Sequence, residues 1–143
     1  MSLFGGLEIS ASGLTAERLR MDVTAENLAN AQTTRGADGK PYQRKVVALQ
    51  AAGTGFGSTL GGAMRAGAGG VRVAGIQADT TPNRLVYDPG HPDADARGYV
   101  SMPNVQPVTE MVDLISASRG YEANVTVMQT AKQMFSKTLE ILK

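Results

Sequence analysis

The C-terminal stretch of residues 107–143, PVTEMVDLISASRGYEANVTVMQTAKQMFSKTLEILK, decides the fold, because large apolar residues recur in it every seven positions. This series consists of Leu114, Tyr121, Met128, Phe135 and Leu142. An interleaved series is mostly apolar and runs through Met111, Ser118, Val125, Lys132 and Leu139. Apolar residues that alternate three and four apart form one stripe along a helix, and a sustained stripe is typical of a coiled-coil seam. The sequence therefore predicts one long C-terminal helix.

The N-terminal segment repeats this pattern. Its large apolar residues Leu7, Leu14, Met21 and Leu28 also fall seven apart, with alanines at the shorter spacing. We predict a helix over residues 7–31, which ends where Asn and β-branched Thr residues favour other conformations. We expect the two terminal helices to pair with each other and with copies or neighbouring subunits.

A small β-rich region is predicted between the helices. Strand-like runs separated by prolines and glycines occupy residues 41–50, 71–76, 84–87 and 99–102. Residues 53–70 hold eight glycines and few large side chains, so we expect a mobile loop there.

The predicted fold class is α+β, mainly α, with long terminal helices that pair as an antiparallel coiled coil. Asn104 is suited to cap the last helix. The predicted organisation is a helical segment 1–35, a β-rich middle region 36–103 with the Gly-rich loop 53–70, and a C-terminal helix 104–143.

The predicted helices differ in length, and this difference leaves apolar surface uncovered. A C-terminal helix of about 40 residues spans on the order of 60 Å, whereas an N-terminal helix of about 25 residues spans roughly 38 Å. Uncovered apolar surface usually marks an interface. The candidate assembly residues are Leu7, Leu14, Met21, Leu28, Leu114, Tyr121, Val125, Met128, Phe135 and Leu139.

Two alternatives remain open for these helices. Leu7, Leu14 and Met21 taken alone also fit an ordinary two-helix core inside a monomer. Asn27 and Asn30 are either polar residues of a helix end, or amides that fix the register between neighbouring helices.

Composition excludes several classes of protein. Fourteen Lys and Arg residues balance thirteen Asp and Glu residues, so we expect neither nucleic-acid binding nor attraction to an anionic membrane. The chain has no cysteine, and no apolar run approaches the ~20 residues of a membrane span. The first residues lack the basic and apolar parts of a cleavable signal peptide. If the protein leaves the cytoplasm, we expect its N-terminus to stay intact.

No motif predicts catalysis, a cofactor or a metal site. Asp88, His91, Asp93 and Asp95 cluster in one loop, but Arg97 stands at the third ligand position of a calcium loop. Side chains that cap the backbone of their own turn explain this loop better. Gly57 and Gly62 have the spacing of a P-loop, but Ala63 stands in place of its lysine.

Three blocks of sequence resemble the flagellar rod and hook axial protein family. Residues 10–34, SASGLTAERLRMDVTAENLANAQTT, resemble the N-terminal signature of that family. Residues 84–95, RLVYDPGHPDAD, followed by 98–105, GYVSMPNV, are similar to the middle of its proximal rod member. Residues 110–125, EMVDLISASRGYEANV, resemble the C-terminal helix of that member, with Gly120 in place of Ala or Ser.

The resemblance implies a non-enzymatic structural subunit of the bacterial flagellar basal-body rod. Members of the family leave the cytoplasm unfolded and uncleaved through the flagellar type III export apparatus. They assemble helically with copies and with other rod proteins, outside the cytoplasmic membrane and above the membrane ring. Their terminal helices pair and line the inner tube of the rod. The alternative is a soluble helical adaptor that docks on one partner.

Overall fold

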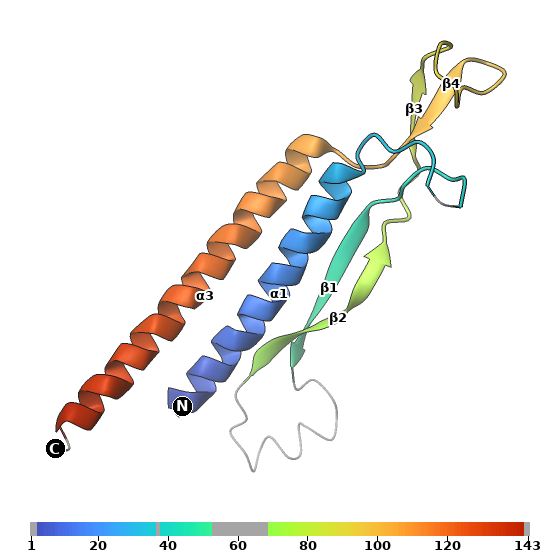
Figure 1. Ribbon diagram of the computed structural model, residues 1–143. Coiled ribbons are helices and arrows are strands. Elements are labelled where there is room, and N and C mark those ends of the chain that lie inside the picture. The colour runs from blue at the N-terminus through green and yellow to red at the C-terminus, as the bar shows by residue number, and fades with distance from the viewer. Residues whose placement is uncertain (1–2, 37, 53–68, 142–143) are drawn as a thin grey trace. The chain divides into compact units, whose positions relative to one another are not determined.

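A computed structural model describes residues 3–36, 38–52 and 69–141 of the chain (Figure 1). Two helices enclose a region of short strands in the sequence, as predicted for an α+β, mainly α fold. The elements are α1 (Leu3–Ala29), β1 (Lys45–Ala52), β2 (Gly70–Ala78), β3 (Arg84–Tyr87), β4 (Tyr99–Met102) and α3 (Pro107–Ile141). No helix in these ranges has both the length and the apolar character needed to cross a membrane.

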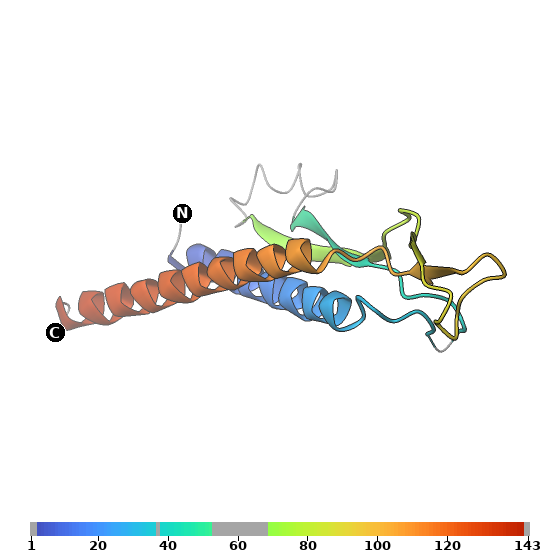
Figure 2. The same ribbon diagram turned by 90° about the horizontal axis from the view of Figure 1, so that it is seen from above.

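The chain divides into two compact units. We call the first the terminal unit; it comprises Met1–Leu19, Ala48–Gly75 and Ser116–Lys143. We call the second the hairpin unit; it comprises Arg20–Val47 and Ile76–Ile115. Each unit contains a stretch of both helices, which run side by side in both views (Figure 1, Figure 2).

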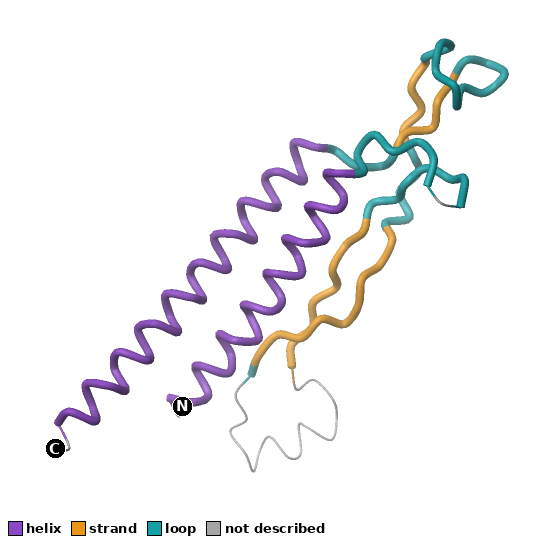
Figure 3. Tube along the Cα trace, viewed as in Figure 1, coloured by secondary structure: helices purple, strands orange, loops and turns teal. Residues whose placement is uncertain are grey.

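The strands form two separate two-stranded sheets (Figure 3). β3 and β4 are antiparallel and begin and end as predicted, with Val86 opposite Val100 and Tyr87 opposite Tyr99. The rings of this tyrosine pair meet edge to face at 5.3 Å. In the loop between β3 and β4, the carboxylate of Asp95 accepts hydrogen bonds from the N–H groups of Tyr99 and Arg97. These bonds lower the pKa of Asp95. The loop carboxylates therefore cap their own backbone.

Several predicted boundaries were wrong. α1 begins at Leu3 and ends at Ala29, whereas the prediction was 7–31. β1 begins at Lys45, because Tyr42 pairs instead with the loop carbonyl of Thr33. Asn104 does not cap α3, which begins at Pro107. The predicted loop 53–70 lies outside the described residues, apart from Gly69 and Gly70, the second of which begins β2.

Candidate assembly surface

Small and polar residues form the contact between α1 and α3 in the terminal unit. A Cβ atom added at Gly13 would lie 3.1 Å from the amide of Asn124, and one added at Gly120 would lie 3.2 Å from the carboxyl of Glu17. A step of four along α1 therefore matches a step of four backward along α3, which makes the pair antiparallel. Extended along α1, this register sets Leu3 level with Met134.

In the terminal unit, the most buried helix positions carry little side-chain volume. Ala16 is 2% exposed and Ala117 is fully buried. The residues that α3 turns toward α1 include Glu110, Ala117 and Asn124, which also lie seven apart. Small side chains let two helix backbones approach closely, so this seam stabilises the pair with little apolar volume.

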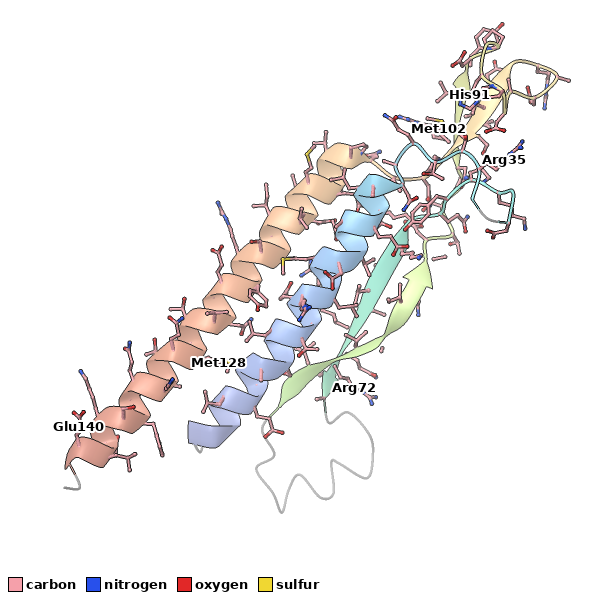
Figure 4. The ribbon with its side chains drawn as sticks, viewed as in Figure 1. Arg35, Arg72, His91, Met102, Met128 and Glu140 are labelled. Carbon is pink, nitrogen blue, oxygen red and sulfur yellow. The ribbon has the colours of Figure 1, made fainter. Side chains whose placement is uncertain are left out.

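The predicted assembly residues lie beside this seam rather than in it. Leu7, Val125 and Met128 come together in the terminal unit, where they line an apolar groove of about 500 Å³ with Gln129 and Lys132. Figure 4 labels Met128 on α3 and Glu140 near the end of that helix. Of the other predicted assembly residues, five are half-buried: Leu14, Met21, Leu28, Leu114 and Tyr121. Phe135 and Leu139 are exposed.

The structure adds apolar residues that sequence reasoning missed. Val108, Val112 and Ile115 are 70%, 60% and 56% exposed, and Met111 beside them is exposed as well. We call these four residues the head stripe, because they share one face of the first turns of α3. Their spacing of three, four and seven was visible in the sequence. The two heptad series that end at Leu142 and Leu139 do not contain Val108, Val112 or Ile115.

Exposed apolar surface is distributed unequally between the two helices. Among the helix residues whose burial is described, α1 exposes one large apolar side chain, that of Ile9. α3 exposes eight, which are Val108, Met111, Val112, Ile115, Val127, Met134, Phe135 and Leu139. The surface available for association therefore belongs mainly to α3.

A polar cluster in the hairpin unit, centred on Asn27, joins α1, α3 and β1. The side-chain amide of Asn27 donates to the carbonyl of Lys45 at 2.8 Å and to the carboxylate of Glu110 at 3.0 Å. Its side-chain oxygen accepts the N–H of Lys45 and the hydroxyl of Tyr42, each at 2.9 Å. Asn27 and Glu110 are each 1% exposed. All the partners of Asn27 thus lie within its own chain, whereas Asn30 caps the end of α1 through the carbonyl of Glu26.

Arg44 completes this cluster by compensating the buried charge of Glu110. Its Nε donates to Glu110 at 2.5 Å, and its other nitrogens approach Asp113 at 3.3 Å and Asp79 at 3.7 Å. The bond to Glu110 raises the pKa of Arg44 above its ordinary value. Hydrogen bonds from Thr81, with the charge of Arg44, lower the pKa of Asp79. Buried charges that are paired and hydrogen-bonded in this way are tolerated inside a fold.

The buried polar side chains that the structure describes make structural contacts. In the described part of the chain, every buried side-chain nitrogen or oxygen has a hydrogen-bond partner. Arg35, labelled in Figure 4, pairs with Asp93 at 2.7 Å, and Thr34 donates to the same carboxylate. Within the described ranges, no three acidic or histidine side chains are grouped closely enough to hold a metal ion. These polar contacts hold the elements of each unit together, and the arrangement is suited to contacts with other proteins.

Two terminal helices with a small-residue seam and an exposed apolar face define a structural subunit that associates with other proteins. Comparison with known proteins identifies the class more narrowly. Residues 7–37 match the family described as flagella basal body rod protein. Residues 96–141 match the family described as flagellar basal body rod FlgEFG protein C-terminal.

Full-length relatives identify the family. The chain is 51% identical to the flagellar basal-body rod protein FlgC of Bacillus subtilis, over all of both chains. It is 47% identical to FlgC of Escherichia coli O6:H1, over 99% of this chain and 98% of that one. It is 40% identical to FlgC of Aquifex aeolicus, over 100% of this chain and 99% of that one. The chain belongs to the FlgC family and is a structural subunit of the flagellar basal-body rod, where it assembles with other rod proteins.

Proposed function

We propose that this chain assembles helically in the proximal part of the rod, through the outward faces of its terminal helices. Copies of itself and other rod proteins are the neighbours, and α3 supplies most of the contact. The ten candidate assembly residues predicted from the sequence and the head stripe form this contact surface.

The exposed apolar face of α3 is the observation that carries this proposal. Fully burying one large apolar side chain is worth roughly 1.5–3 kcal/mol. A helical assembly repeats each contact at every subunit, so several such side chains suffice without a large interface on any single copy. A contact that does not close on itself gives an open helical array.

We also propose an export route and a location for the chain. It leaves the cytoplasm through the flagellar type III export apparatus and lies outside the cytoplasmic membrane, at the base of the rod near the membrane ring. It has no catalytic role. Full-length similarity to rod proteins supports this route, and mass spectrometry of the subunit from purified basal bodies tests it. We expect the chain to be exported without cleavage, and loss of residues from the N-terminus would contradict this.

The assembly surface is tested by placing a carboxylate in the groove. Met128→Asp, expressed in a strain that lacks the native copy, should abolish rod completion while the subunit is still secreted. The physical reason is that an unpaired charge is costly to bury. Lys137→Ala is the matched control, since it changes an exposed residue of the same helix. Normal rods from both Met128→Asp and Phe135→Asp would show that this surface is not an interface.

An adaptor remains the competing function and predicts different association behaviour. An adaptor forms a closed complex of fixed stoichiometry with one partner. A rod subunit mixed with other rod proteins gives complexes whose size grows with concentration. Sedimentation velocity over a range of concentrations separates the two, and a size that stays constant would favour the adaptor.

A further inference from the structure

The small residues of the seam between α1 and α3 bear on which alignment of the two helices the chain adopts. Small side chains fit against one another in more than one alignment, because none of them needs a matching hollow. Gly13 meets Asn124, and Ala16 and Ala117 are buried in the same seam. Close packing alone therefore does not define the register of this pair.

The sequence of α3 limits the competing alignments. A slide of four residues would bring Leu114 to the place of Glu110, opposite the buried Asn27. Leucine is too large and apolar for that position. A slide of seven, roughly 10 Å along the helix, brings Ala117 to that place and sets Ala131 against Gly13. Alanine fits beside glycine, so this slide keeps a small residue against Gly13, whereas it sets Asn124 at the place of the fully buried Ala117 and Val127 at the place of Gly120. We take the seven-residue slide as the competing alignment.

The bond between Asn27 and Glu110 is lost in this competing alignment. Ala117 cannot accept the amide of Asn27, and Glu110 would leave the position at which Arg44 donates to it at 2.5 Å. A buried donor without an acceptor and a buried charge without its partner both destabilise a structure strongly. The polar cluster thus penalises this slide in addition to its effect on the seam.

We propose that Asn27 and Glu110 act as a register lock, which selects one alignment of α1 and α3 and thereby sets which side chains line the assembly groove. This inference rests on the proposed assembly through the terminal helices. In the selected register Leu7 lines the groove with Val125 and Met128. After a seven-residue slide, Lys132 and Phe135 would replace these two residues. The lock therefore determines what a neighbouring subunit meets.

The absence of cysteine from the chain allows the register to be read directly. Leu7→Cys with Met128→Cys reports the selected register, because both positions line one groove. Leu7→Cys with Phe135→Cys reports the competing one, seven residues further along α3. In the otherwise native chain we expect the first pair to oxidise at least about tenfold faster than the second.

The lock is tested by exchanging its amide and its carboxylate. Asn27→Asp keeps the oxygen that accepts from Lys45 and Tyr42, but it loses the donors to the carbonyl of Lys45 and to Glu110 and sets a second carboxylate beside Glu110. We expect the ratio of the two oxidation rates to fall at least about tenfold in this variant. Adding Glu110→Gln restores an amide–carboxylate pair with the roles reversed, and we expect the ratio to return to within about threefold of its original value. Asn30→Asp is the matched control and leaves the ratio unchanged.

The outcomes separate the lock from assembly itself. An unchanged ratio in a helical Asn27→Asp chain would overturn the lock. If Asn27→Asp fails to fold, the double variant decides: a native ratio supports the lock, and a scrambled ratio overturns it. Incorporation of the unaltered chain into basal bodies is measured separately. Its failure would count against the proposed function, whereas an unchanged oxidation ratio would count only against the lock.

Discussion

Asn27 is the residue at which the contacts of α1, β1 and α3 converge. Its side chain uses both hydrogens and both lone pairs of its amide, on Lys45, Tyr42 and Glu110. Removing it leaves several buried partners unsatisfied at once. We therefore expect Asn27→Ala to reduce the free energy of unfolding by at least about 2 kcal/mol, measured by urea denaturation.

Asn30→Ala is the control for this prediction. Asn30 bonds the carbonyl of Glu26 in an exposed setting, and we expect a loss below about 1 kcal/mol. Equal losses of unfolding free energy in the two variants would show that the buried network around Asn27 adds no stability beyond that of a helix-end amide.

Tyr42 gives the hairpin unit a pH dependence on the alkaline side. Burial, followed by the negative charges of Glu26 and Glu110, raises the pKa of its hydroxyl to about 12. A group whose pKa is higher in the folded than in the unfolded state stabilises the fold fully below the unfolded value. That contribution is lost as the pH rises, so the free energy of unfolding should fall between pH 10 and about 12.

Denaturation at a series of alkaline pH values measures this fall. Tyr42→Phe should flatten the slope in that interval, whereas Tyr87→Phe, which changes an exposed tyrosine, should leave it intact. A slope that survives Tyr42→Phe would assign the effect to another group.

At the scale of the elements, two glycines of the seam are expected to respond oppositely to alanine. A Cβ at Gly120 meets the long side chain of Glu17 at 3.2 Å, and a flexible side chain can turn aside. Alanine favours a helix over glycine by about 1 kcal/mol. Gly120→Ala should therefore raise the melting temperature by about 2–4 °C.

Gly13→Ala should lower the melting temperature instead. Its Cβ would lie 3.1 Å from the short side chain of Asn124, which is held by a 2.9 Å bond to the carbonyl of Gly120. Overpacking of about 1–3 kcal/mol exceeds the gain in helix propensity. Differential scanning calorimetry gives the melting temperature of both variants. A rise in both would show that the seam accommodates an added Cβ at either glycine.

Local patterns predicted the elements well and the seam poorly. β3 and β4 have the predicted bounds, because prolines and glycines flank them on both sides. Large residues at heptad spacing predicted both helices but not their contact, since a search for large apolar residues overlooks Gly13 and Ala117. The bond from Asn27 to Glu110 spans 83 residues. No local pattern reports a partner that far away, so the role of Asn27 stayed open between two interpretations.

At the scale of the whole molecule, the exposed head stripe predicts a defect in assembly. Val112→Asp places a charge in the exposed head stripe and should prevent incorporation into basal bodies while leaving secretion normal. Thr126→Asp is the control, because it adds the same charge at an exposed position of the same helix. Quantitative immunoblots of secreted subunit and purified basal bodies give both readouts. Equal incorporation of the two variants would exclude the head stripe from the interface.

Hydrogen exchange of the free subunit should show where order is lost. Amides near Asn27 and Glu110 should exchange slowly, since these residues are buried and bonded. From Lys132 to Glu140 every side chain of α3 is exposed, and unsupported helix ends open easily. We expect protection to decline after Met128 and to return on assembly. Uniformly slow exchange along α3 in dilute monomer would contradict this.

The antiparallel pairing also decides where the subunit can carry a label. Within the terminal unit the register sets Leu3 of α1 level with Met134 of α3, so the first turn of α1 and the last turns of α3 lie at the same end of the helix pair. A fluorescent protein fused next to either of these helix ends would lie at the end of the pair that carries the groove of Leu7 and Met128. We expect it to block the association of further subunits there. The exposed turn at Asp38–Lys40 in the hairpin unit is remote from that groove in sequence and suits a short epitope better.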